Sequence, residues 1–251
     1  MNTYVLWTGG WDSTFRMVQL SVDGKANDTI QAIYVAGDDR KSEKREIQAM
    51  NEIIGLLRGI SCSTINDIII IDKARIKENA TITDAYYYMR SIVPLGSQYE
   101  FLSRLAVEYP GIELGIERPN GEFGGCTEAI NKTGSLLKKN GSYYIDTDNS
   151  SEECNALFGN FSFPLTDLTE LDMVEWIEER GLSYIMKHIW FCHNPINGEP
   201  CGICRPCQQK MECNMNWLLP KDAQARYRKY AVIKRVFGEK IGRRIGNTLI
   251  R

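Results

Sequence analysis

The string TGGWDST, residues 8–14, follows a short apolar run that begins at Tyr4. Two adjacent glycines let the backbone adopt positive φ angles and bring its N–H groups close to an anion. A helix that begins at Ser13 or Thr14 adds unpaired N–H groups and the positive end of its dipole at the same point. A Gly-Gly pair after a strand is also an ordinary turn, so the string alone leaves two interpretations open. The phosphate-binding interpretation predicts a strand, loop and helix of the α/β class.

No lysine follows the two glycines, so the string is not a Walker loop, which ends in Gly-Lys-Ser/Thr. A loop of this kind suits a pyrophosphate group, as when ATP is cleaved between its α and β phosphates. Asp12 is available for a metal ion or for capping the helix. The string resembles the SGG-x-DS-[TS] signature of the PP-loop ATP pyrophosphatase superfamily, with Thr8 in place of the usual serine.

Members of that superfamily adenylate a carboxylate, a urea-type oxygen or a tRNA base, and a nitrogen or sulfur nucleophile then displaces AMP. The resemblance implies that ATP and Mg²⁺ are cofactors and that Asp12 and Ser13 are the catalytic residues. The implied ATP-binding residues are Thr8, Gly9, Gly10, Asp12, Ser13, Thr14, Val35 and Arg40.

Strand-like and helical patterns alternate along the first half of the chain, which predicts an open parallel sheet with helices on both faces. The strand-like runs are Tyr4–Trp7, Gln31–Val35, Asp67–Ile71 and Ile112–Ile116, and the helical patterns are Thr14–Ser21, Ser42–Arg58 and Glu100–Glu108. Residues 73–96 show an irregular pattern, and residues 132–159 have the composition of an insertion or long loop. Ligands of such sheets bind beyond the carboxyl ends of the strands, so residues 36–44 and 117–128 are candidate site loops.

Length and composition suit one α/β domain with an appendage, since the chain has 251 residues of which 43% are apolar. No apolar run approaches the roughly 20 residues of a membrane span, and we expect a cytosolic protein without a membrane segment. Eight cysteines in a cytosolic chain favour metal binding or ordinary burial over disulfides.

Four of the cysteines, Cys192, Cys201, Cys204 and Cys207, lie within sixteen residues and form two overlapping Cys-x-x-Cys steps. Four thiolates complete a tetrahedral zinc shell and leave no position for water, so the spacing predicts a structural Zn²⁺ site. An iron–sulfur cluster and a redox thiol pair remain alternatives. Cys126, in the string GEFGGCTEA, is either a buried bystander or a nucleophile, and buried status is favoured because no histidine lies nearby in sequence.

The loop string, the segment PLTDLTE at 164–170 and the cysteine cluster occur in the same order as in the 7-cyano-7-deazaguanine synthase family, which the first 215 residues resemble. That family forms homodimers and uses ATP, magnesium and zinc. Its enzymes adenylate 7-carboxy-7-deazaguanine, admit ammonia to form the amide, and dehydrate the amide to the nitrile after a second activation. The resemblance implies that this chain does the same.

The sequence departs from the family pattern where the substrate is expected to bind. Ser97 and Gln98 replace an Arg-Asn pair, GEFGGCTE keeps Cys126 but loses an aspartate and an arginine, and Glu170 stands where a lysine is expected. Gln98, Glu122 and Cys126 are therefore the predicted substrate residues, with Glu117 and Glu128 as further acceptors for a deazaguanine ring. These changes keep open a variant that joins the activated base to an amine of a partner protein, a tRNA-thiolating enzyme, and a non-catalytic binding protein.

The sequence predicts a nucleotide-binding domain at 1–185, a zinc-binding segment at 186–220 and a basic C-terminal helix at 221–251. The last of these contains ten lysines and arginines against Asp222 and Glu239. Such a segment can contact nucleic acid, but tyrosines and apolar residues at helical spacing favour an amphipathic helix with a solvated basic face.

Overall fold

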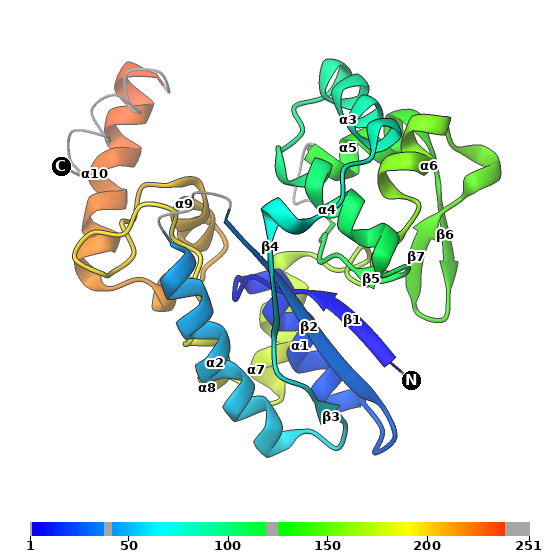
Figure 1. Cartoon of the computed structure of the whole chain (residues 1–251). Coiled ribbons are helices and arrows are strands. Elements are labelled where there is room, and N and C mark those ends of the chain that lie inside the picture. Colours follow the sequence, from blue (N-terminus) through cyan, green and yellow to red (C-terminus); the bar gives the residue numbers. More distant parts are fainter. Residues whose placement is uncertain (1, 38–41, 119–124, 239–251) are drawn as a thin grey trace.

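The computed structural model describes residues 2–37, 42–118 and 125–238. Within these residues, a six-stranded sheet has the order β3-β2-β1-β5-β8, and β4 also pairs with β2 (Figure 1). The strands are β1 (Asn2–Leu6), β2 (Thr29–Ala36), β3 (Thr64–Ile65), β4 (Ile69–Asp72), β5 (Ile112–Glu113) and β8 (Phe161–Ser162). Every pair in this sheet is parallel, which confirms the predicted α/β class.

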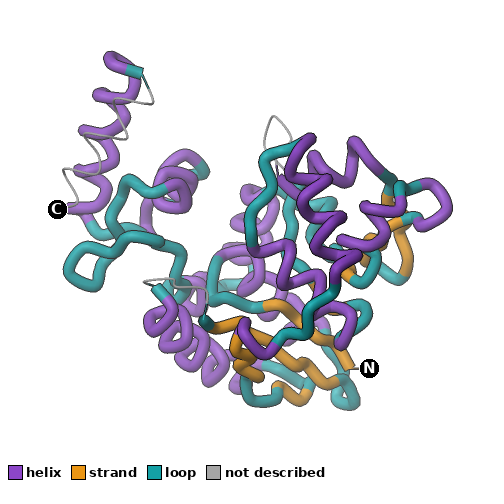
Figure 2. The backbone as a smooth tube through the Cα atoms, turned by 45° about the horizontal axis from the view of Figure 1, so that its top comes forward, coloured by secondary structure: helices purple, strands orange, loops and turns teal. Residues whose placement is uncertain are grey.

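Helices cover both faces of the sheet, and the tube view shows them on either side of the strands (Figure 2). One layer consists of α1 (Trp11–Asp23), α2 (Glu43–Ile60), α7 (Glu170–Glu179) and α8 (Ser183–Met186). The other consists of α3 (Ala80–Ile92), α4 (Gln98–Glu108), α5 (Gly125–Thr133) and α6 (Glu152–Phe158). Short 3₁₀ turns lie at Lys73–Arg75, Thr147–Asn149 and Asn216–Leu218.

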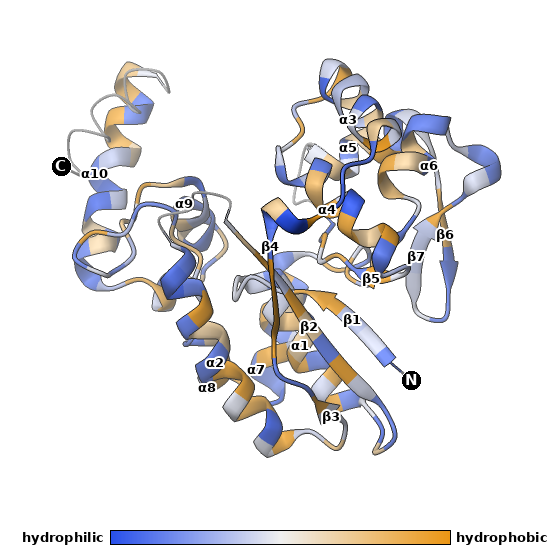
Figure 3. Ribbon diagram, in the orientation of Figure 1, coloured by the Kyte–Doolittle hydropathy of each residue, from blue (hydrophilic) through white to orange (hydrophobic). Residues whose placement is uncertain are grey.

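Two hydrophobic cores form because successive side chains of a strand point to opposite faces. In β1 and its continuation, Val5 and Trp7 enter the core under α1 and α2, whereas Leu6 enters the core under α3 to α6. Ile33 and Val35 of β2 join Leu6. The central strands are accordingly apolar along much of their length (Figure 3), as a sheet buried on both faces requires.

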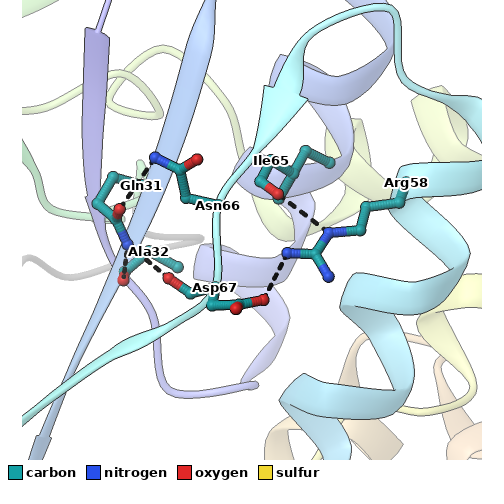
Figure 4. A network of polar contacts seen from close by, with 6 residues as sticks. All are labelled: Gln31, Ala32, Arg58, Ile65, Asn66 and Asp67. Atoms are coloured by element: carbon teal, nitrogen blue, oxygen red, sulfur yellow. Dashed lines mark hydrogen bonds and ion pairs between the residues drawn. The ribbon is translucent and has the colours of Figure 1, made fainter.

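A polar network holds the outer edge of β2, where β3 ends and β4 has not yet begun (Figure 4). Arg58 donates to the carbonyl of Ile65 at 3.0 Å and to the carboxylate of Asp67 at 2.7 Å. Gln31 donates to the carbonyl of Asp67 at 2.7 Å and accepts from the amide of Asn66 at 3.1 Å. The strand pairing with β2 is interrupted between β3 and β4. The side chains of Arg58 and Gln31 supply hydrogen bonds there to the carbonyls of Ile65 and Asp67.

Three local structures differ from the sequence-based expectations. Helix α1 begins at Trp11, two residues before the earlier of the two predicted starts, so Asp12 belongs to its first turn. Residues 73–96, predicted to be irregular, contain α3, whose cap is Asn79, with its side chain accepting from the Ile82 N–H at 3.2 Å. Of the three adjacent tyrosines in this helix, only Tyr86 is buried.

Residues 132–159, expected to be an insertion or a long loop, contain an ordered hairpin followed by helix α6. Strands β6 (Leu136–Lys139) and β7 (Ser142–Ile145) are antiparallel, and Asn140 and Gly141 between them both have positive φ angles, 51° and 83°. A two-residue Asn-Gly turn of this kind matches the right-handed twist of a hairpin.

The remaining segment contains helices α9 (Arg205–Glu212) and α10 (Lys221–Phe237) and forms a third, smaller core. In Figure 1 α10 extends away from the sheet, and it confirms a helix over the described part of the basic C-terminal region. Its Tyr230 is buried, whereas Val236 and Phe237 are exposed. Among the described helices, none combines the length and apolar composition that crossing a bilayer requires.

Candidate functional site

The N-terminus of α1 lies at the carboxyl end of β1, and its N–H groups have no side-chain cap. Gly10 is the cap residue and offers no side-chain oxygen. The first helical bond runs from the Thr14 N–H to the Gly10 carbonyl at 3.1 Å. The N–H groups of Trp11, Asp12 and Ser13 are therefore unpaired within the helix, as the first turn of every helix requires. Such a terminus is suited to an anion.

Glycines permit two close approaches around this terminus. Gly9 has a φ of 71°, and a Cβ at this position would lie 3.1 Å from Met50 Cγ of α2. On the other side, a Cβ at Gly115 would lie 3.3 Å from the Ser13 nitrogen. The chain after β5 passes directly over the first turn of α1. This close approach is possible because Gly115 has no side chain.

A cavity of about 210 Å³ opens at the carboxyl ends of β1, β2 and β5. Its wall includes Thr8, Gly10, Asp12 and Ser13 from the loop and helix start, Val35 from β2, and Gln98 from the start of α4. The Ser13 hydroxyl accepts from the Thr8 N–H at 3.5 Å, the outer limit for a hydrogen bond. Six residues that the sequence predicts to bind ATP or substrate thus line one cavity.

A second cavity of about 310 Å³ lies between the loop and the cysteine-rich segment. It shares Thr8, Gly10, Asp12 and Gln98 with the first cavity, and Trp190 and Lys210 line its other side. Drug-sized ligands occupy pockets of about 300–1,000 Å³, a range that the two adjoining cavities reach together.

Charged side chains lie beside the second cavity. For two carboxylates, burial is the main cause of a raised pKa. Burial raises the pKa of Asp12 to about 6, an effect that Glu170 adds to and Lys210 opposes. Burial, followed by the charges of Asp12 and Glu170, raises the pKa of Glu117 to about 8. Lys210 and Glu170 form a buried ion pair. The Nζ atom of Lys210 also lies 5.1 Å from the centre of the Trp11 ring. A cation in this region would favour the ionised carboxylates.

Other predicted site residues lie away from the cavity walls. Gly9 packs against α2, and the hydroxyl of Thr14 is buried and accepts from the Trp7 indole at 2.9 Å. Cys126 is buried in α5, and burial raises its pKa well above the ordinary value, which disfavours a thiolate nucleophile. Arg40 and Glu122 lie outside the described residues.

The four predicted metal ligands converge. The sulfur atoms of Cys192, Cys201, Cys204 and Cys207 all lie within 4.8 Å of one another. Individual sulfur–sulfur distances are 3.4 Å for Cys204–Cys207 and 3.9 Å for both Cys204–Cys192 and Cys201–Cys207. Tetrahedral Zn–S bonds of about 2.3 Å place sulfurs about 3.8 Å apart, so the set fits zinc. Hydrogen bonding with Cys192 is the largest influence on the pKa of Cys201 and of Cys204, and it lowers both.

The backbone conformation and hydrogen bonds around the cysteines favour the convergence of the four sulfur atoms. Gly202 has a φ of 83°, and a Cβ there would lie 2.1 Å from the Ala223 carbonyl at the start of α10. The N–H groups of Ile203 and Cys204 point at the Cys201 sulfur, at 3.4 and 3.2 Å. Arg226 of α10 donates to the carbonyl of Cys201 at 2.8 Å. The described residues therefore contain a four-cysteine cluster that could hold a metal such as zinc.

The cysteine-rich segment also contacts the loop of Gly9 and Gly10, which the sequence did not reveal. The Trp190 N–H donates to the Gly9 carbonyl at 2.8 Å, and Gln209 of α9 donates to Glu117 at 3.2 Å. Gln209, Lys210 and Gly115 are the site residues that sequence reasoning missed. For Gly115 a signal existed, because it lies inside the predicted strand Ile112–Ile116, and a glycine within a strand often marks a close backbone approach.

Searches against protein-family models and against curated proteins found no match for this chain.

Proposed function

We propose that this chain is an ATP-dependent enzyme that activates a carboxylate by adenylation and releases pyrophosphate and then AMP. The observation that carries the proposal is the uncapped N-terminus of α1, which lines a cavity at the carboxyl ends of three parallel strands. Parallel α/β sheets bind ligands at this position, and the missing Walker lysine favours cleavage between the α and β phosphates.

The nucleotide and its metal fit the residues present. The unpaired N–H groups of α1 suit the phosphates, and Val35 with its apolar neighbours Leu6 and Ile33 suits the adenosine. Asp12 lines both cavities, and its raised pKa reflects a carboxylate without full compensation of its charge. Asp12 would hold Mg²⁺, which neutralises developing phosphate charge when bound.

The reaction has two steps. A carboxylate oxygen attacks the α-phosphorus and pyrophosphate leaves, which gives an acyl-adenylate. A nitrogen nucleophile then attacks the acyl carbon and AMP leaves. In the enzyme we propose, 7-carboxy-7-deazaguanine is the carboxylate and ammonia the nucleophile, giving the amide and, after a second activation, the nitrile. Gln98 lines both cavities and would contact the acyl substrate.

An amine of a partner protein is the alternative nucleophile, which the substitutions around Gln98 and Cys126 keep open. A tRNA-thiolating enzyme is less well supported, because it needs a reactive cysteine pair. Cys126 and Cys154 are both buried, and burial raises the pKa of each thiol. Four other cysteines are the candidate ligands of a metal ion.

The test is incubation of the zinc-loaded protein with Mg-ATP and 7-carboxy-7-deazaguanine, with and without ammonium, followed by mass spectrometry of AMP and the base. Ammonium-dependent amide or nitrile supports the synthase reaction. AMP formation without a free base product supports a protein amine as acceptor. Absence of AMP under all conditions contradicts adenylation of this substrate.

Asp12→Ala provides the variant control for that assay. The loss of the carboxylate should abolish AMP formation, whereas zinc content should stay at the wild-type level because the cysteines are untouched. Full AMP formation by Asp12→Ala would exclude the assigned role of the first turn of α1.

A further inference from the structure

The phosphate loop contains no cation, although a bound triphosphate or pyrophosphate needs one. Among the described residues that line the two cavities, Lys210 is the only lysine or arginine. It belongs to α9 of the cysteine-rich segment, far from the loop in sequence.

The surroundings of Lys210 are negative. It lies beside Glu170, and the charges of Asp12 and Glu117 are close enough to act on the same region. A phosphate chain entering the second cavity would be repelled by these carboxylates unless a cation lay between them. Lys210 supplies a cation on the wall of that cavity.

Lys210 also retains hydrogen-bonding capacity. An ammonium group has three donors, and the hydrogen bond recorded for its Nζ within the described part of the chain goes to Glu170 Oε1. The Nζ atom also lies over the Trp11 ring, 5.1 Å from its centre. The group can therefore keep Glu170 and still donate to an anion in the cavity.

Two helices fix the positions of Lys210 and its partner Glu170. Glu170 is the first residue of α7, where Thr169 and Asp172 form a capping box that fixes the start of the helix. Lys210 follows the metal ligand Cys207 by one helical turn in α9, whose Pro206 favours the helix start. Both side chains of the pair are almost fully buried, at 5% and 1% relative exposure. A buried lysine with a fixed counter-ion has little conformational entropy left to lose on binding.

We propose that Lys210 is the cation that binds the β and γ phosphates of ATP, and the pyrophosphate product, with Glu170 as the counter-ion that positions it. This inference rests on the proposed function, since it assigns one partner of the same nucleotide. In this enzyme the helix of the metal segment supplies the charge that a Walker loop carries in its own lysine.

The test compares binding of Mg-pyrophosphate and of AMP by isothermal titration calorimetry. Lys210→Met alone leaves Glu170 buried without a partner and endangers folding, so the decisive variant is Lys210→Met with Glu170→Gln, which removes both charges. The matched control is Lys138→Met with Asp167→Asn, another lysine–carboxylate pair that lies exposed on the β6–β7 side. Zinc content and thermal unfolding of both double variants verify that the fold is intact.

We expect the Lys210 double variant to bind Mg-pyrophosphate about 10- to 100-fold more weakly than wild type, as for loss of a hydrogen bond to a charged group. Its AMP affinity, and all affinities of the control, should stay at the wild-type level. Unchanged pyrophosphate affinity in a folded Lys210 double variant overturns the inference while leaving the proposed function intact. A wild-type protein that binds neither AMP nor pyrophosphate overturns both.

Discussion

A methyl group added at Gly115 tests the phosphate site with little disturbance of the fold. The φ angle of Gly115 lies outside the left-handed region, so alanine fits the backbone there. Its Cβ would lie 3.3 Å from the Ser13 nitrogen and 3.5 Å from the Asp12 Cβ. The methyl group would therefore cover an N–H that we expect to donate to phosphate.

The magnitude follows from the loss of that one donor. A hydrogen bond to a charged group contributes about 1.5–3 kcal/mol, so Gly115→Ala should weaken Mg-ATP binding by about 10- to 150-fold. The free energy of unfolding should change by less than about 1 kcal/mol, because the smaller entropy of the unfolded alanine chain offsets the tight contact.

Calorimetric titration with Mg-ATP and urea unfolding measure the two quantities separately. Gly55→Ala is the matched control, since Gly55 lies in α2 with no atom within 4 Å of an added Cβ. That variant should be more stable than wild type by about 0.5–1 kcal/mol and should bind Mg-ATP unchanged. Wild-type affinity in Gly115→Ala would refute the assignment of phosphate to the first turn of α1.

Three further predictions concern single groups. Cys204→Ser removes one of four metal ligands and should lower zinc content and soluble yield together; an active, zinc-free protein would contradict a structural metal. Iodoacetamide should alkylate the exposed Cys62 and spare the buried Cys126 in the native protein, as peptide mass spectrometry can show, and equal modification would contradict the burial of Cys126. Burial raises the pKa of Glu117 from its ordinary 4.5 to about 8, so the folded state holds a proton that the unfolded state releases. The free energy of unfolding in magnesium-free buffer should fall as the pH rises between those values. Glu117→Gln should flatten that fall in urea titrations, and an unchanged pH slope would contradict the raised pKa.

Local signals account for what the sequence predicted well. The apolar runs around Val5 and Ile33 have the length and flanking turns of buried strands, and β1 and β2 lie where these runs predicted them. The cysteine spacing restricts the four sulfurs to one turn-rich segment, and they do converge. In both cases the residues that decide the structure are close together in the chain.

Two misses had signals that were present in the sequence. Ile82, Ala85 and Met89 are spaced for one helical face and are buried in α3, so residues 73–96 are not irregular. The dipeptide Asn140-Gly141 predicts a hairpin wherever strand-forming residues flank it. The surrounding serines, lysines and glycines concealed it in a composition-based view of the segment.

The pair of Lys210 and Glu170 could not have been predicted from any pattern. The two residues lie 40 positions apart, and each alone is an ordinary charged residue on a helix. Their burial arises only when α9 packs beside the start of α7, which depends on the tertiary arrangement of the cysteine-rich segment. The charges of a site whose residues come from distant segments can therefore be assigned only once the tertiary fold is known.

The same packing connects the four-cysteine cluster to the cavities. Its segment holds the Gly9 carbonyl through Trp190, contacts Glu117 through Gln209 and carries Lys210 into the second cavity. A metal that orders this segment therefore also orders one wall of the proposed nucleotide site. By linkage, if zinc raises nucleotide affinity, bound nucleotide raises zinc affinity by the same factor. At a given concentration, a chelator should consequently remove less zinc when Mg-ATP is present. This protection by Mg-ATP should decrease in the double variant that lacks Lys210 and Glu170.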